Sequence, residues 1–308
     1  NKQYKIVVEH RQSEGNAAIK LRGGNFVKTD MNALVAKHKD ADVFIFAGGI
    51  SPQLEGEEMK VNFPGFDGGD RTTIMLPNIQ TQCMKALQKS GKPVVFVMMT
   101  GSAIAIPEED KNIPAILNAW YGGQAAGAAI TDVLFGDYNP AGRLPVTFYK
   151  SDSDLPGFKD YDMSNRTYRY FTGEALYPFG YGLSYSTFSY TDIKAAKDHQ
   201  KGKPITLKTK VTNTGKKGGE EVVQCYVSHT TKDVKKPIRA LKGFQRIYLK
   251  AGETKEISFT LTPEDLSIVN ESGEMYQPSG IVDISIGGGQ PNAESIKNQT
   301  VKSVMVVV

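Results

Sequence analysis

Residues 43–59, VFIFAGGISPQLEGEEM, combine an uninterrupted apolar run, a glycine pair and a cluster of three glutamates. A strand that is apolar at every position, and not only at every second one, is typical of a parallel sheet covered on both faces. A second run of this kind follows at residues 93–99, and a further short apolar run at residues 115–120. These three runs indicate an α/β fold.

Segments with helical periodicity separate the apolar runs. Asp30 is suited to cap a helix that leads into the first run. Residues 79–87 repeat apolar side chains at helical spacing before Gly91, and residues 125–134 predict a helix of small residues that ends at Gly136. The alternation of helices and buried strands predicts a mostly parallel sheet sandwiched by helices.

The pattern changes near residue 190, because short amphipathic strands replace the buried ones. Residues 205–211 and 257–261 alternate apolar and polar side chains, and glycine-containing turns separate such stretches. This spacing is typical of an all-β sandwich, which we expect to contain about seven strands over residues 191–308. Residues 149–188 are rich in Asp, Gly, Tyr and Phe and predict an ordered connector.

The chain opens on two short strand patterns, at residues 4–10 and 17–22, joined by a turn-rich segment. A lone hairpin is not a domain. Residue 1 is Asn and not Met, so we expect that the beginning of the gene product is missing.

Composition excludes several classes of protein. Of 308 residues 40% are hydrophobic and 23% charged, which is ordinary for a soluble globular chain with two domains. The net charge of +4 comes from scattered lysines, so we expect no nucleic-acid partner. No apolar run approaches the roughly 20 residues of a membrane span. Cys83 and Cys225 fit small buried hydrophobes, and the four histidines form no metal set, so we expect no metal and no cofactor.

The glutamate cluster is the candidate site for chemistry. Glu55, Glu57 and Glu58 lie just past the carboxyl end of a buried strand, where α/β proteins bind their ligands. Crowded carboxylates repel one another, which favours the protonated form of one of them and suits it to donate a proton. The alternative is a solvated acidic surface loop without a chemical role.

A series of motifs runs along the chain at residues 48–59, 69–80, 91–95, 119–124, 134–148, 166–171 and 177–185. In their order these motifs resemble the α/β-sandwich domain of family 3 glycoside hydrolases. The family's terminal fibronectin type III-like domain is matched by residues 211–215, 219–224, 241–244 and 252–254. The resemblance extends over essentially the whole chain from about residue 40.

The resemblance implies roles for particular residues. The family's proton donor is a glutamate in the loop after this strand, before an Asp-Arg pair, and it matches Glu57. Residues 60–69 separate the glutamates from Asp70-Arg71 and depart from the simplest pattern, so Glu55 and Glu58 remain alternatives. The family retains configuration with two carboxyl groups about 5–5.5 Å apart. Its attacking aspartate lies on an N-terminal β/α barrel, which this chain lacks.

The resemblance also implies an organisation. Residues 1–24 resemble the end of a PA14-like β-domain, residues 25–190 the α/β-sandwich domain with its connector, and residues 191–308 the fibronectin type III-like domain. The implied function is hydrolysis of terminal non-reducing β-linked sugars from oligosaccharides by a secreted or periplasmic enzyme. A β-xylosidase is the first choice and a β-glucosidase the alternative, because residues 54–59 look more like the family's xylosidases. The competing class is a non-catalytic scaffold or carbohydrate-binding fragment.

Trp120 and Tyr121 follow the third apolar run and precede a glycine pair. Two aromatic residues in a loop could contact a sugar, but aromatic residues more often pack in a core. The sequence alone leaves both interpretations open.

Overall fold

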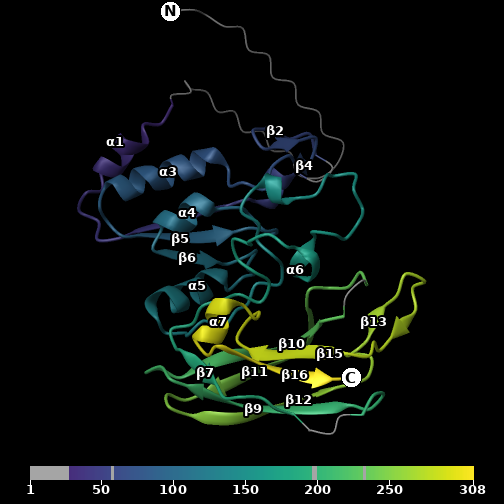
Figure 1. Cartoon of the computed structure of the whole chain (residues 1–308). Coiled ribbons are helices and arrows are strands. Elements are labelled where there is room, and N and C mark those ends of the chain that lie inside the picture. The colour runs from purple at the N-terminus through teal and green to yellow at the C-terminus, as the bar shows by residue number, and fades with distance from the viewer. Residues whose placement is uncertain (1–27, 57–58, 196–199, 232–233) are drawn as a thin grey trace, which may run out of the picture.

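The computed structural model describes residues 28–56, 59–195, 200–231 and 234–308. Its elements form an α/β layer, which extends to residue 135, and a β-sandwich that begins at residue 188 (Figure 1). The hairpin expected at residues 4–10 and 17–22 lies outside the described residues.

The α/β layer is built on a three-stranded parallel sheet in the order β1-β5-β6. The strands are β1 (Phe44–Gly49), β5 (Val94–Met99) and β6 (Ala115–Asn118). All three predicted apolar runs therefore form strands, and the predicted parallel sheet is confirmed. Phe96 and Met98 of β5 are fully buried, as expected for the central strand.

Helices flank and connect these strands: α1 (Met31–Ala36) precedes β1, α3 (Asn78–Lys89) lies between β1 and β5, α4 (Pro107–Asn112) lies between β5 and β6, and α5 (Ala126–Phe135) follows β6. The Asp30 carboxylate accepts hydrogen bonds from two backbone N–H groups of α1, and Gly136 ends α5 in the left-handed conformation, as predicted. Figure 1 shows α3 and α5 on opposite sides of the sheet. Helix α5 packs less closely than α3, because none of the residues of α5 is buried.

Residues 50–56 and 59–77, between β1 and α3, contain more regular structure than their sequence suggests. They contain the short helix α2 (Pro52–Glu55) and a small antiparallel sheet of β2 (Asn62–Phe63), β3 (Phe66–Asp67) and β4 (Asp70–Arg71). Phe66 is buried and packs on the hydrophobic core of the α/β layer. The segment that separates the glutamates from Asp70-Arg71 thus forms structure of its own.

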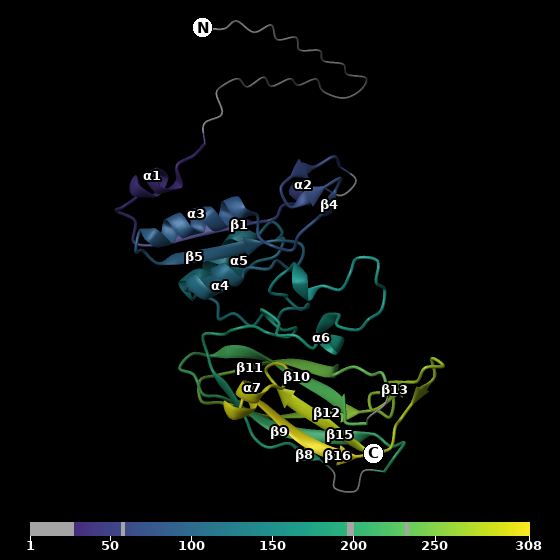
Figure 2. The same cartoon turned by 45° about the horizontal axis from the view of Figure 1, so that its top comes forward.

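The connector runs between the two layers and contains η1 (Asp152–Asp154) and α6 (Thr167–Tyr170) (Figure 2). Asn139, before it, is a hydrogen-bonding centre. Its amide donates to Ser186 Oγ and Gly218 O at 3.0 Å each, and its Oδ1 accepts from Ser184 Oγ and Tyr185 N at 2.8 Å each. These contacts join the end of the α/β layer to the start of the sandwich.

The sandwich consists of two antiparallel sheets, as predicted. One has the order β11-β10-β15-β16 and the other β12-β9-β7, with β8 pairing to β9. The strands are β7 (Phe188–Tyr190), β8 (Lys194–Ala195), β9 (Ile205–Asn213), β10 (Gly219–His229), β11 (Ala240–Leu249), β12 (Thr254–Leu261), β15 (Ile281–Gly287) and β16 (Val301–Val307). A separate ribbon, β13 (Ile268–Val269) with β14 (Met275–Tyr276), and helix α7 (Ala293–Lys297) flank them.

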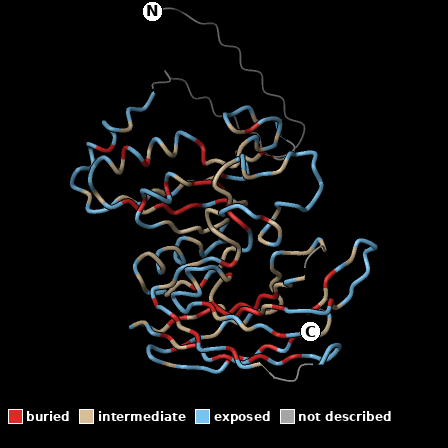
Figure 3. Tube along the Cα trace, in the orientation of Figure 1, coloured by how far each residue is buried: buried red, intermediate tan, exposed pale blue. Residues whose placement is uncertain are grey.

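Alternating side chains of the sandwich strands form its core. In β9 every second residue from Ile205 to Asn213 is buried, and β12 buries Ile257, Phe259 and Leu261. Figure 3 shows the buried residues concentrated along the strands of both layers. Cys225 of β10 is fully buried here, and burial raises the pKa of its thiol to about 12. This is consistent with the predicted role as a small apolar side chain.

Candidate active site

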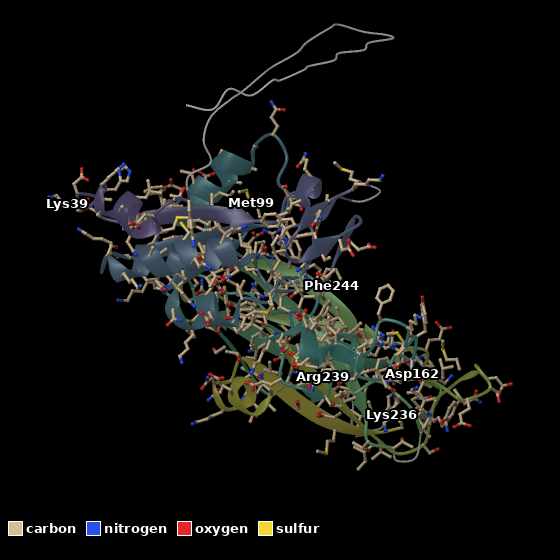
Figure 4. All side chains as sticks on the ribbon, turned by 90° about the horizontal axis from the view of Figure 1, so that it is seen from above. Lys39, Met99, Asp162, Lys236, Arg239 and Phe244 are labelled. Atoms are coloured by element: carbon tan, nitrogen blue, oxygen red, sulfur yellow. The ribbon has the colours of Figure 1, made fainter. Side chains whose placement is uncertain are left out.

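The carboxyl ends of the three parallel strands lie at one edge of the sheet, and the glutamate segment leaves from there. β1 ends at Gly49, β5 at Met99, which is labelled in Figure 4, and β6 at Asn118. Loops that follow neighbouring parallel strands converge at this edge, which is where α/β sheets bind ligands. Side chains far apart in sequence therefore meet here.

Gly49 fixes the direction in which the chain leaves β1. Its φ is +125°, and a Cβ at this position would lie 1.9 Å from the carbonyl oxygen of Met99. The Gln80 side-chain amide bonds both backbone polar groups of Gly49, accepting from Gly49 N at 2.8 Å and donating to Gly49 O at 2.6 Å. The neighbouring strand and this amide thus hold the exit from the sheet in one geometry.

Helix α2 then places Glu55. Ser51 caps the helix by accepting from Leu54 N at 3.2 Å, Pro52 occupies its first turn, and Gly56 ends it with a φ of +64°. Serine at the cap, proline next and a left-handed glycine at the end are the residues that such a short helix requires. Glu55 is therefore the last residue of a turn that is closed at both ends.

The Glu55 carboxylate contacts both neighbouring loops. Ser102, after β5, donates its hydroxyl to Glu55 Oε1 at 3.1 Å. Tyr121, after β6, donates to Ile50 O at 2.6 Å, and its hydroxyl lies 3.2 Å from Glu55 Oε2. Burial, and next the nearby Glu55 charge, raise the pKa of Tyr121, so the hydroxyl keeps its proton.

Arg71 completes this cluster from β4. Its Nη1 donates to Ser102 Oγ at 2.8 Å and to Ala103 O at 3.2 Å, and its Nε donates to Thr73 O at 3.3 Å. Burial lowers the pKa of Arg71, an effect that the Glu55 charge opposes. Because Ser102 accepts from Arg71, its own proton is available for Glu55. Arg71 therefore acts on Glu55 through a hydroxyl and not through a direct ion pair.

The connector also reaches this edge. The Asp152 carboxylate accepts from Thr73 Oγ1 and from Ile74 N, each at 2.7 Å. Thr73 is the residue whose carbonyl oxygen accepts from Arg71. A segment beyond α5 thus braces the residues that support the cluster.

The structure describes some of the residues that the sequence predicts for the site, but not all of them. Glu57 and Glu58 lie outside the described residues, so their roles stay predictions. Glu55 lies in the cluster described above. Trp120 packs edge-on against the core residue Phe148, with ring centroids 6.1 Å apart, whereas Tyr121 reaches the site. Trp120 thus fits the core interpretation, and a sugar contact by Tyr121 stays a prediction.

Ser102 is the site residue that sequence reasoning missed. Its one local signal is its place in Thr100-Gly101-Ser102, directly after an apolar strand. Within the described ranges, no group of three or more His, Cys, Asp or Glu side chains could hold a metal ion. In the same part of the chain, no helix combines the length and apolar character needed to cross a membrane.

Comparison with known proteins agrees with this architecture. Residues 4–185 match the glycosyl hydrolase family 3 C-terminal domain, and residues 221–290 match the fibronectin type III-like domain. A xylan 1,4-beta-xylosidase of Xylanibacter ruminicola is 46% identical over 88% of this chain and 31% of its own length. A periplasmic beta-glucosidase of Salmonella typhimurium is 37% identical over 81% of this chain and 33% of its own length.

A solved β-glucosidase structure from Erythrobacter marinus has a TM-score of 0.75 and 31% identity, covering 90% of this chain and 36% of its own. The chain therefore spans about a third of the length of the curated relatives it matches. It corresponds to their C-terminal part, the part that follows the N-terminal barrel domain in such enzymes. The predicted resemblance is thus confirmed: the chain belongs to glycosyl hydrolase family 3 and carries its C-terminal domain followed by a fibronectin type III-like domain.

Proposed function

We propose that the full-length protein is a retaining, exo-acting β-xylosidase and that Glu57 is its general acid/base. The observation that carries the proposal is the position of the glutamate segment, which begins at the carboxyl edge of the parallel sheet in a family 3 glycoside hydrolase. The choice of xylose is supported by the name of the relative that is 46% identical.

In this mechanism two carboxyl groups divide the work. An aspartate on the N-terminal barrel, outside this chain, attacks the anomeric carbon and displaces the leaving oxygen. Glu57 donates its proton to that oxygen and, in the second step, takes a proton from the water that releases the sugar. The partner of this chain is therefore the barrel domain of the same protein, and the substrate is the non-reducing end of an oligosaccharide. No cofactor takes part in either step.

Two further parts of the proposal concern the whole protein. A secreted or periplasmic location is supported by the name of the periplasmic relative. A PA14-like origin for residues 1–24 is supported by the strand pattern of the opening segment alone.

The test is hydrolysis of p-nitrophenyl β-xyloside and β-glucoside by the full-length gene product, with wild type beside Glu57→Ala. Loss of general acid/base catalysis lowers kcat by about 10²- to 10⁴-fold, and added azide restores turnover because it needs no deprotonation. Glu58→Ala is the matched control from the adjacent position. Preference for the glucoside would change the sugar, full activity of Glu57→Ala would remove its role, and an inactive wild type would favour the scaffold.

A further inference from the structure

Glu55 is held by groups from three different segments. Its two carboxylate oxygens lie 3.1 Å from Ser102 Oγ and 3.2 Å from the Tyr121 hydroxyl, which come from the loops after β5 and β6. Ser102 in turn accepts from Arg71 Nη1 at 2.8 Å. Oε1 therefore accepts a proton from Ser102, and Oε2 lies beside the Tyr121 hydroxyl, whose single proton it shares with Ile50 O. A proton donor to substrate instead needs an O–H directed at the leaving oxygen.

The groups that hold Glu55 are themselves fixed. The buried Thr100 side chain donates to Ser102 O at 2.8 Å and accepts from Ser102 N at 3.2 Å, which sets the position of the serine. The Tyr121 hydroxyl donates to Ile50 O at 2.6 Å, directly after β1. Displacing the Glu55 carboxylate would leave the Ser102 hydroxyl proton, in a partly buried position, without its acceptor.

The chain on either side of residues 57–58 is also held. Gly56, directly after Glu55, has a φ of +64°, and its missing Cβ would lie 2.1 Å from Val61 Cγ2. Gly56 O accepts from Met59 N at 2.7 Å, and Val61 O accepts from Gly68 N at 3.3 Å. Gly56 and Met59, the described residues nearest to Glu57 in the chain, are thus held in place, and Gly56 is adjacent to Glu55.

We propose that Glu55 is a positioning residue: Ser102, Tyr121 and, through Ser102, Arg71 hold its carboxylate and thereby fix the start of the segment that carries Glu57. The inference rests on the proposed function, because it assigns Glu55 a role only if the protein cleaves glycosides. It takes Glu55 out of the set of candidate proton donors. It also adds Tyr121 and Ser102 to the residues on which the rate depends.

The experiment uses the full-length enzyme and substrates that differ in their need for acid catalysis. Wild type, Glu55→Gln, Tyr121→Phe and Glu57→Ala are compared on 2,4-dinitrophenyl β-xyloside, whose leaving group needs little protonation, and on xylobiose, whose leaving group needs it. Tyr138→Phe is the matched control, because Tyr138 also donates to a glutamate, Glu220, at 2.8 Å but far from this edge.

Glu55→Gln and Tyr121→Phe should lower kcat on xylobiose by about ten- to a hundredfold, as expected for a misplaced catalytic group, with KM changed less than about twofold. The loss on the dinitrophenyl substrate should be smaller, the alkaline limb of the pH profile should shift, and azide should yield no glycosyl azide. Tyr138→Phe should match wild type.

The outcomes separate the two proposals. An inactive wild-type enzyme overturns the proposed function itself. An active wild type with unchanged kcat and pH profiles in both variants overturns the positioning role alone. Formation of glycosyl azide by Glu55→Gln also overturns it, because Glu55 would then be the acid/base. If Glu55→Gln does not fold, Tyr121→Phe and Ser102→Ala decide the question through the same leaving-group comparison.

Discussion

Arg143 Nη2 lies 2.8 Å from Glu221 Oε2, in an ion pair whose side chains are only 10% and 4% exposed. Arg143 precedes the connector and Glu221 belongs to β10, so the pair joins the two layers. The second carboxylate oxygen accepts from the Tyr190 hydroxyl at 2.8 Å. Burial raises the pKa of Glu221, against the opposing effect of Arg143.

Removing one partner of this pair should destabilise the protein more than removing both. Arg143→Met leaves a buried carboxylate without its counterion, which costs about 3–5 kcal/mol, whereas the double variant Arg143→Met/Glu221→Leu should lose less. Urea denaturation of the four proteins in a double-mutant cycle measures the difference. Additive losses would show that the two charges do not interact in the folded protein.

Gly49 should tolerate no side chain. Gly49→Ala places a Cβ against the Met99 carbonyl at a φ of +125°, and we expect a loss of at least about 3 kcal/mol in the free energy of unfolding. Gly91→Ala is the control, since Gly91 also has a positive φ, +75°, but nothing lies within 4 Å of its added Cβ. That change should cost about 1 kcal/mol. Equal losses in thermal denaturation would contradict the steric explanation.

Asp283 on β15 should make stability depend on pH. Its Oδ1 is buried without a hydrogen-bond partner among the described residues, and burial raises the pKa of this carboxyl. The folded protein therefore binds the proton more tightly than the unfolded chain. This contribution to stability is present below the ordinary pKa of aspartate and is lost as pH rises through the raised value.

Asp283→Asn should consequently stabilise the protein at pH 7, by about 0.5 kcal/mol because the side chain is only partly buried, and should give no gain at pH 3. Urea titrations at both values measure this. Asp40→Asn, at an exposed position, should show no such difference. A gain of the same size at both pH values would exclude ionisation as its cause.

Asn139 should not be replaceable by its closest analogue. Asn139→Asp keeps the shape but brings a carboxylate oxygen to the Gly218 carbonyl, which accepts at 3.0 Å in the wild type. We expect a loss of about 2–3 kcal/mol at neutral pH, from the lost hydrogen bonds and the new repulsion. Asn139→Ala should lose less than Asn139→Asp if repulsion contributes, and differential scanning calorimetry distinguishes the two.

The sequence predicts the elements whose pattern is long and periodic. The runs that became β1 and β5 are apolar throughout, that of β6 is apolar up to Asn118, and Gly136 ends α5 where a left-handed glycine is expected. Strands β2, β3 and β4 contain two residues each, too few to show any alternation. Their existence depends on Phe66 packing on the core, which is a tertiary contact that no local pattern encodes.

The candidate site was predictable in the same limited way. The position of the glutamates after a buried strand identifies the edge of the sheet, because the ends of parallel strands share it. The contacts of Glu55 do not follow from this, since Ser102 and Tyr121 are 47 and 66 residues away in the chain. The order of the strands and the direction of the two loops bring these residues to Glu55. Neither can be read from the spacing of residues in the sequence.

The connector has a consequence for exchanging domains between relatives. Gln224 of β10 donates to Gly180 O at 3.0 Å, and Gln290 donates to Phe179 O at 2.7 Å, so the sandwich recognises the connector backbone. A chimera joined at residue 190 would pair a foreign sandwich with this connector and interrupt those contacts. A graft that keeps residues 137–308 together transfers both sides of the interface. Domain exchange between relatives should therefore transfer the sandwich and its connector as one piece.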